Sequence, residues 1–223
     1  MKTQKRSFPK IIEEQVKKWQ LMKVKDKKEA VIFPVIAISR EPGSGGRIVA
    51  TELGKKLGFD VFHQEIINEM AESAQVNTRV LETLDEKGLS VLEDWITSLV
   101  NTQHLWPDQY LRHLMKVIGT VGKHGNAVIV GRGANFVLPP EGRIRVRIVA
   151  PLDVRVENVS RNFGVSAEDA KRRIIRTESE RRAFIRKYFN ADITDPINYD
   201  LVLNTETLSL EAAADAIKSA LKS

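Results

Sequence analysis

The sequence predicts an α/β fold in which helices cover both faces of a parallel sheet. The main observation is that short apolar, strand-like runs alternate with helix-like segments from about Val31 to the end of the chain. A second observation is that one such run, 35–39, leads directly into a glycine-rich turn and then into a helical pattern. The chain has 223 residues, of which 42% are hydrophobic and 29% charged, which suffices for one core with an appendage.

The composition excludes several kinds of site. Because the chain has no cysteine, it forms neither disulfides nor cysteine-based zinc sites. No apolar run reaches the roughly 18 residues needed to cross a bilayer, and the basic N-terminus lacks the apolar region of a signal peptide. The histidines are scattered without metal-ligand spacing. We therefore expect a cytoplasmic protein with no membrane partner.

The net charge of +6 is confined to an N-terminal arm, residues 1–30. The arm contains ten Lys or Arg and four Asp or Glu, whereas the domain that we expect at 31–223 contains 25 residues of each sign. A domain with no net charge lacks the basic footprint of a nucleic-acid-binding fold, so we do not expect nucleic acid as a partner.

Apolar residues recur at helical spacing in the arm, which predicts a basic amphipathic helix: Ile11, Ile12, Val16, Trp19 and Met22. This pattern has two interpretations. The helix docks on the body of its own chain or on a second copy, forming a homodimer, or it lies on an anionic surface. The apolar face is short and includes Gln15, which favours docking.

The remaining elements are expected in the following order along the chain. A first buried strand runs from Val31 to Ser39, interrupted by Pro34, and the helix after the glycine-rich turn ends at Gly58. The later segments are a strand at 59–62, helices at 64–74, 78–86, 91–100 and 109–123, strands at 127–130 and 144–150, helices at 152–162 and 166–188, a strand at 201–204 and a helix at 209–221.

The turn between the first strand and its helix predicts a phosphate-binding loop, made of Gly43, Ser44, Gly45, Gly46 and Arg47. Backbone N–H groups of such a loop and of the helix start converge on an anion, and the helix dipole favours negative charge. The standard loop reads G-x-x-x-x-G-K-[ST], but here Gly46 stands where the lysine is expected, followed by Arg47 and Ile48. A tight turn without a ligand is the alternative.

Two arginine-rich segments supply candidate anion ligands. Arg132 follows a short strand and is flanked by glycines, at the sheet edge where ligands of parallel sheets bind. Its planar fork suits a phosphate or a carboxylate, and a structural ion pair is the alternative. Residues 171–187 carry eight cations and only two acids. The cations repel one another unless an anion or carboxylates lie between them. Together with a phosphate loop, this run predicts the lid of a small-molecule kinase rather than a merely solvated face.

These pieces, in this order, resemble the cytidylate kinase-like family of P-loop nucleoside monophosphate kinases. The resemblance rests on 38–47, 130–134, 147–152, 178–181 and 198–204. It implies a three-layer P-loop kinase fold with a five-stranded parallel sheet, a helical monophosphate-binding insertion at about 64–123 and an arginine-rich lid at about 160–190. The implied reaction transfers the γ-phosphoryl group of ATP to CMP, dCMP or a related small acceptor, with Mg²⁺ as cofactor.

The resemblance also implies roles for individual residues. The loop 43–47 would hold the donor phosphates, and the residues implied in catalysis are Arg47, Arg132, Glu178 and Arg181. Arg132 would grip the acceptor phosphate, and His63 stands where the family has an acceptor-binding aspartate. In the lid, Arg181 would contact the transferring phosphates with Glu178 orienting it, alongside Arg173, Arg176 and Arg182. Asn204 and Thr205 would lie beside the adenine, and no metal ligand is assigned. The missing lysine leaves one alternative, a nucleotide-binding regulatory protein with a degenerate loop.

Overall fold

The computed structural model describes residues 7–25 and 34–221, and the expected start of the first strand at Val31 lies outside them. Within the described residues, five parallel strands form one sheet in the order β2-β3-β1-β4-β5. The strands are β1 Val35–Arg40, β2 Asp60–Phe62, β3 Ala127–Val130, β4 Arg143–Val149 and β5 Leu201–Asn204. The predicted α/β class and five-stranded parallel sheet are thus confirmed.

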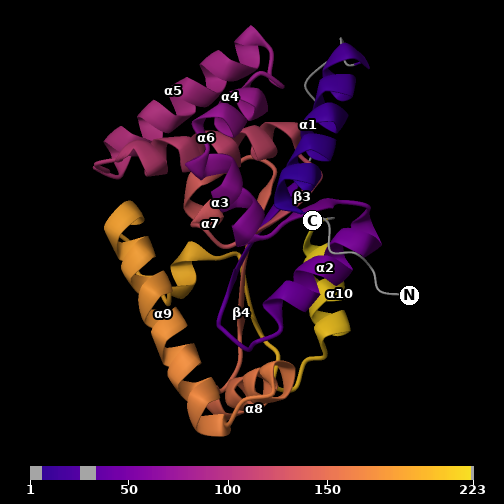
Figure 1. Cartoon of the computed structure of the whole chain (residues 1–223), viewed down its shortest axis with the longest axis vertical. Coiled ribbons are helices and arrows are strands. Elements are labelled where there is room, and N and C mark those ends of the chain that lie inside the picture. The colour runs from indigo at the N-terminus through magenta and orange to yellow at the C-terminus, as the bar shows by residue number, and fades with distance from the viewer. Residues whose placement is uncertain (1–6, 26–33, 222–223) are drawn as a thin grey trace.

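Helices cover both faces of the sheet, because the buried strands carry apolar side chains on both sides. Ile36 and Ile38 of β1 belong to the core under α2 (Gly46–Leu57) and α10 (Leu210–Ala220), which lie side by side in Figure 1. Val35 and Ala37, which alternate with them, belong to the larger core on the other face. That core includes α6 (Gln109–His124) and the short helix α7 (Ala134–Val137).

Helices α3 to α6 form the insertion between β2 and β3. Their bounds are α3 Gln64–Glu72, α4 Ala74–Leu81, α5 Glu86–Thr102 and α6 Gln109–His124. The predicted helix at 78–86 is wrong in its bounds, because side-chain caps divide this segment differently. Ser73 accepts a hydrogen bond from Val76 N and so starts α4 early, whereas Asp85 accepts one from Gly88 N and starts α5.

The arm forms helix α1 (Phe8–Lys25), which packs on the body of its own chain. Ile12, Val16 and Trp19 are buried in the larger core. The Trp19 ring stacks on Phe62 at 5.8 Å and on His124 at 4.5 Å between ring centroids. The apolar face of the amphipathic pattern therefore points inward, and Lys10, Lys17 and Lys18 are exposed. No helix in the described part of the chain is long and apolar enough to span a membrane.

Helices α8 (Leu152–Phe163) and α9 (Ala167–Phe189) form the segment expected as a lid. In Figure 1, α9 runs along one side of the molecule, from α8 up to the helices of the insertion. Val159, Ala170 and Ile174 form a small cluster between α8 and the first half of α9. The other end of α9 differs, since Ile185 and Phe189 are buried in the larger core. A short 3₁₀ turn, Pro196–Asn198, then leads to β5; like α7, it is too brief to show a periodicity.

Candidate functional site

The glycine-rich loop joins the carboxyl end of β1 to the start of α2, as predicted. Gly43 and Gly45 have positive φ angles of 85° and 76°, a backbone conformation that favours glycine. A Cβ on Gly43 would lie only 2.6 Å from the carbonyl oxygen of Arg155, so the loop also packs too tightly for a side chain. At the start of α2, Ile48 N and Val49 N donate to Gly45 O, whereas the N–H groups of Gly46 and Arg47 precede these bonds and can donate to an anion.

Side chains behind the loop hold its shape. Ser44 is 1% exposed, and its Oγ lies 2.9 Å from Glu41 O and 3.2 Å from Ile148 O, so the hydroxyl is used inside the protein. Thr205 Oγ1 lies 2.8 Å from Ser44 O, and Asn158 Nδ2 donates to Gly43 O at 3.0 Å. Asn204 accepts a hydrogen bond from Glu206 N. The two residues expected beside the adenine therefore lie next to the loop, at the end of β5.

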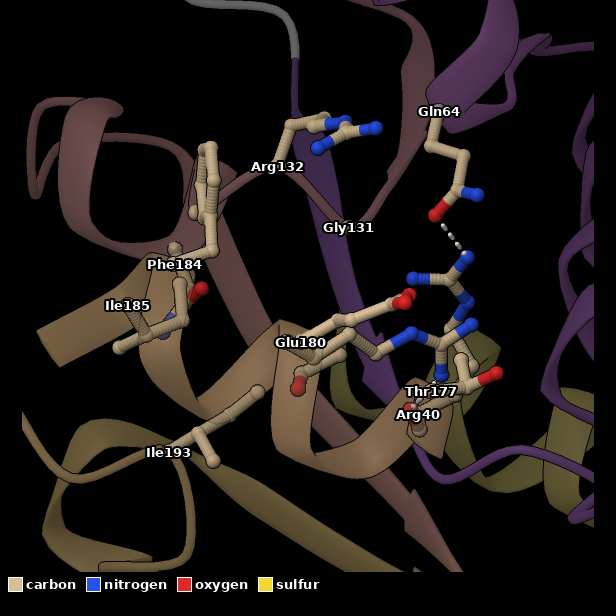
Figure 2. Close-up of a pocket in the computed structure, with 13 residues that line it drawn as sticks. Arg40, Gln64, Gly131, Arg132, Thr177, Glu180, Phe184, Ile185 and Ile193 are labelled. Atoms are coloured by element: carbon tan, nitrogen blue, oxygen red, sulfur yellow. Dashed lines mark hydrogen bonds between the residues drawn. The ribbon is translucent and has the colours of Figure 1, made fainter. Parts of the chain in front are cut away.

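A cavity of about 180 Å³ opens at the carboxyl edge of the sheet. Arginines from β1, the β3–α7 turn and α9 line it, namely Arg40, Arg132 and Arg181. Figure 2 shows the side chains of Arg40 and Arg132 on either side of Gly131, with Phe184 and Ile185 of α9 on the opposite wall. The cavity thus combines cationic groups from distant parts of the sequence with an apolar wall.

Arg132 stands at the end of β3, where the sequence predicted it. Its own φ is 55°, and the flanking Gly131 and Gly133 have φ of 83° and 69°. This left-handed run ends the strand and turns the side chain toward α9, where its Cζ lies 5.3 Å from the ring centroid of Phe184. Arg132 Nε is buried with no hydrogen-bond partner among the described residues. The side chain therefore keeps a donor for a ligand.

Arg181 reaches the same cavity from α9. Its Nη1 donates to the carbonyl oxygen of Arg40 at 2.7 Å, which links the middle of α9 to the end of β1. Burial, and then the charges of Arg147 and Arg132, lower the pKa of Arg181 to about 10. The guanidinium is thus held in a region that already carries excess positive charge.

Arg40 is a functional candidate that the sequence analysis missed. It is the last residue of β1, is 6% exposed, and its Nη2 donates to Gln64 Oε1 at 2.7 Å (Figure 2). Its pKa is lowered to about 9, mainly by burial and then by Arg181 and Arg47. The sequence did offer a signal: Arg40 is a charged residue directly after the strand predicted to end at Ser39, at the edge where the loop begins.

Arg47 and His63 lie near this cavity but do not line it. Arg47 Nη1 forms an ion pair with Glu65 Oε1 at 2.7 Å, and its side chain is 55% exposed. His63 is the N-cap residue of α3, and burial followed by the charge of Arg47 lowers its pKa. The expected acceptor pair of His63 and Arg132 is therefore not assembled in one cavity.

Glu178 has a different partner from the one expected. Its Oε1 accepts a hydrogen bond from Arg155 Nη1 at 2.7 Å, and Arg155 Nε in turn donates to Ala150 O at 2.8 Å. Arg155 Nε also lies 3.4 Å from Glu41 Oε2, at the start of the loop. Glu178 therefore links the lid to the loop through Arg155, and its charge also acts on Arg181.

The other arginines expected in the lid lie outside the cavity. Arg173 packs over the ring of Phe163 at 5.8 Å, Arg176 Nε donates to Glu180 Oε1 at 2.9 Å, and Arg182 lines a separate groove on the outer side of α9. Helical geometry explains the split, since positions 177, 180, 181, 184 and 185 share the inner face. Arg172 pairs with Glu168 and Asp169, and Arg176 pairs with Glu180, so carboxylates of α9 offset part of the positive charge of this helix.

The described residues contain no group of three or more acidic or histidine side chains suited to a metal ion. The carboxylates nearest the loop are already paired. Glu65 binds Arg47, and Glu41 lies 3.4 Å from Arg155 and 3.7 Å from Arg147. The three arginines that line the cavity favour an anionic ligand.

The chain is similar to known proteins in both sequence and fold. The cytidylate kinase of Ignicoccus hospitalis is 28% identical over 188 residues, covering 84% of this chain and 98% of that protein. That of Methanobrevibacter smithii is 30% identical over 192 residues, covering 84% and 98%. A crystal structure of an uncharacterized protein from Eubacterium ventriosum has a TM-score of 0.64 at 20% identity, covering 85% of this chain and 99% of that one.

The family assignment rests on a longer match. Residues 35–207, which include all strands of the described residues, the glycine-rich loop and the arginines of the cavity, match the model of the cytidylate kinase-like family. The chain therefore belongs to the cytidylate kinase-like family.

Proposed function

We propose that this kinase-family protein transfers the γ-phosphoryl group of ATP to a nucleoside monophosphate, with CMP or dCMP as the acceptor. The observation that carries the proposal is the meeting of Arg132 and Arg181 in one cavity beside the glycine-rich loop. Phosphoryl transfer needs in-line positioning of two phosphates and neutralisation of their charge, with little covalent chemistry from the protein. The arginines of the cavity and the backbone N–H groups of the loop support the proposal, because both are donors to phosphate oxygens.

Each part of the site has a role in this reaction. Backbone N–H groups of the loop and of the start of α2 hold the donor phosphates. Arg132 binds the acceptor phosphate in bidentate fashion, and Arg181 lies across from it on α9 to stabilise charge on the transferring group. The apolar wall of Phe184 and Ile185 limits access of water, which would otherwise compete as the acceptor.

Mg²⁺ is expected to enter with ATP. The carboxylates nearest the loop are paired with arginines, and the side chain that follows Arg47 is the apolar Ile48. The ion would therefore be held by phosphate oxygens and water, a mode that Mg²⁺ favours, and would neutralise charge on the donor phosphates. We assign no ligand of this chain to it.

The choice of acceptor follows the relatives, which are cytidylate kinases of 28% and 30% identity. The test is an ADP-release assay with ATP and Mg²⁺ across CMP, dCMP, UMP, AMP and GMP. We expect turnover with the two cytidine nucleotides to exceed that with the purine nucleotides. Release of ADP with none of the five acceptors would contradict the proposal.

A second candidate is a regulatory protein that binds nucleotide without turnover. It is favoured by Gly46 at the lysine position and by the ion pair that holds Arg47 on Glu65. Titration calorimetry with ATP on the same preparation separates the candidates. ATP binding without ADP release in the acceptor series supports the regulatory protein, whereas binding with release supports the kinase.

A further inference from the structure

We propose that Arg40 binds the phosphoryl group in the cavity, and that its guanidinium replaces the lysine that the glycine-rich loop lacks. The inference rests on the proposed function in one respect, namely that the ligand of the cavity is a phosphate group of a substrate. It adds a residue to the site and explains why the loop departs from the standard sequence.

The loop differs from the standard phosphate-binding loop at two positions: one has gained a cationic side chain and the other has lost one. When G-x-x-x-x-G-K-[ST] is aligned on Gly45, its first glycine falls on Arg40 and its lysine falls on Gly46. The chain therefore has a long cation where the standard loop has no side chain, and no side chain where the standard loop has its cation. The number of cations at these two positions is unchanged.

Arg40 and Gly46 are in contact in the folded protein. A Cβ built on Gly46 would lie 2.6 Å from Arg40 Cβ and 3.1 Å from Arg40 Cγ. These distances are too short for a packed interior, so a side chain at position 46 and the stem of Arg40 compete for the same space. The structure thus explains the double change, because an arginine at position 40 requires a glycine at position 46.

The side chain of Arg40 then delivers its charge into the cavity. Its stem passes Gly46 at the start of α2, and its guanidinium lies against Gly131, where a Cβ would overlap with Nη1. Nη2 is held by the neutral side chain of Gln64, and Nε is buried with no partner among the described residues. Because a buried cation without a carboxylate partner is costly, an anion is the expected ligand.

The neighbouring charges point to the same ligand. Arg181 and Arg132 line the cavity with Arg40, and Arg47 is close enough to affect its pKa. Two acids oppose these cations: Glu65, which is itself paired with Arg47, and Glu180, which lines the cavity and accepts a hydrogen bond from Arg176. A phosphate dianion among these groups receives charge-assisted hydrogen bonds and relieves their mutual repulsion.

The first experiment compares the wild-type protein with Arg40→Gln, which keeps the length and polarity but removes the charge. Calorimetric titration with ATP and, separately, with CMP measures binding without turnover. We expect at least one of these affinities to fall by roughly tenfold to hundredfold, the effect of losing a charged hydrogen bond. Arg40→Lys should retain part of the affinity. Arg161→Gln, an exposed arginine of α8 that pairs with Glu157, is the matched control and should bind like the wild type.

The outcomes separate this inference from the proposed function. If the wild type binds nucleotide but releases no ADP, and Arg40→Gln loses the binding, the inference stands and the kinase function fails. If the wild type turns over and Arg40→Gln matches it in ATP affinity, CMP affinity and kcat/KM, the inference fails and the function stands. Thermal melting of each variant establishes that lost binding does not reflect unfolding.

The second experiment exchanges the two residues. Gly46→Lys alone should melt at a lower temperature and bind ATP more weakly than the wild type, because the new side chain meets the stem of Arg40. Arg40→Gly combined with Gly46→Lys removes this contact and restores a loop lysine. The double variant should therefore melt higher than Gly46→Lys and bind at least tenfold more tightly than Arg40→Gly. A double variant that binds no better than Arg40→Gly overturns the inference.

Discussion

At the scale of single residues, buried arginines gather around one small cavity, and this arrangement is energetically costly. Arg40 and Arg181 have pKa values lowered to about 9 and about 10, with burial as the largest cause and other arginines next. Lowered pKa values of this kind mean that the folded protein holds these charges at an energetic cost. A protein retains such a cluster when a ligand of opposite charge repays the cost on binding.

Gly131 lies between Arg40 and Arg132 (Figure 2), and Gly131→Ala tests how tightly these side chains pack against it. The residue has φ of 83°, and an added Cβ would overlap with Arg40 Nη1. We expect a loss of about 1–3 kcal/mol in unfolding free energy from backbone strain, together with weaker nucleotide binding. Gly164→Ala is the matched control, since Gly164 has φ of 63° but nothing within 4 Å of an added Cβ. Both variants should lose stability, and only Gly131→Ala should lose affinity; equal affinities would contradict the prediction.

His63 makes the stability of the protein depend on pH. Burial and the charge of Arg47 lower its pKa in the folded state, and its Nδ1 has no partner among the described residues. Below the usual histidine value of about 6.5, the unfolded chain therefore binds more protons at this residue than the folded one. Stability contributed by neutral His63 is present above that pH and falls as the pH drops through it. Denaturant unfolding from pH 8 to pH 5 should show a steeper loss for the wild type than for His63→Gln, and parallel curves would refute this.

The position of a site residue could be predicted where the neighbouring residues in the sequence determine where its side chain lies. Arg132 lies between two glycines after a short strand, and the structure places it at the sheet edge as predicted. Arg40 was missed because its significance depends on contact with Gly46 and Gly131, which only the folded chain reveals. On α9, the resemblance singled out Arg181 and placed Arg173, Arg176 and Arg182 beside it, but only the packing of the helix shows that Arg181 alone of these four lines the cavity.

At the scale of elements, helix α1 contributes to the core although it lies outside the family match at 35–207. Trp19 is 2% exposed and stacks between Phe62 of β2 and His124 of α6. Its neighbour Gln15 donates a hydrogen bond to Asp60 Oδ2 at 3.1 Å. The helix therefore covers the end of β2, the outermost strand on that side of the sheet.

Trp19→Ala is expected to lower the unfolding free energy by about 3–5 kcal/mol, the usual loss for a buried tryptophan. Leu21→Ala is the control on the same helix, because Leu21 is 66% exposed and its loss should change stability by less than about 0.5 kcal/mol. Chemical denaturation of the full chain gives both values. If the two variants unfold at the same denaturant concentration, α1 is not a stable part of the folded protein.

Element types were predictable where the pattern was long and regular, and bounds were less so. The helix at 109–123 and the strand at 201–204 match α6 and β5 closely because their apolar periodicity is unbroken. The bounds of α4 and α5 differ from the prediction, since hydrogen bonds from the side chains of Ser73 and Asp85 set the starts of these helices. Such bonds depend on side-chain geometry that hydrophobic periodicity does not contain.

At the scale of the whole molecule, the arrangement of the sheet brings the site together. The strand order places β1 between β3 and β4, so the ends of β1 and β3 meet at one edge. Gln64 then joins from the insertion and Arg181 from the lid, more than 100 residues apart in the chain. The parallel sheet was predictable from the alternation of elements, but the cavity depends on how the insertion and α9 pack over that edge.

The two ends of α9 pack on different parts of the protein, so a tilt of this helix moves its two ends by different distances. Ile185 and Phe189 are buried in the larger core, and Tyr188 Oη donates to Asp108 Oδ2 at 2.9 Å, whereas the other end packs on α8. At 1.5 Å per residue, Arg181 lies about 6 Å from Ile185 and the first residue of α9 about 27 Å from it. If α9 tilts as a rigid lever about its buried end, α8 travels between four and five times as far as Arg181.

Such a tilt breaks the hydrogen bond between Asn158 and Gly43 and uncovers the donor side of the loop, while Arg181 stays close to Arg40. Hydrogen exchange should therefore be faster in residues 152–176 than in 184–189, and ATP should slow it in the first segment. Uniform protection along α9 would show that the helix does not move in this way. The movement that admits substrate is then separate from the placement of charge, because α9 turns about a point close to Arg181.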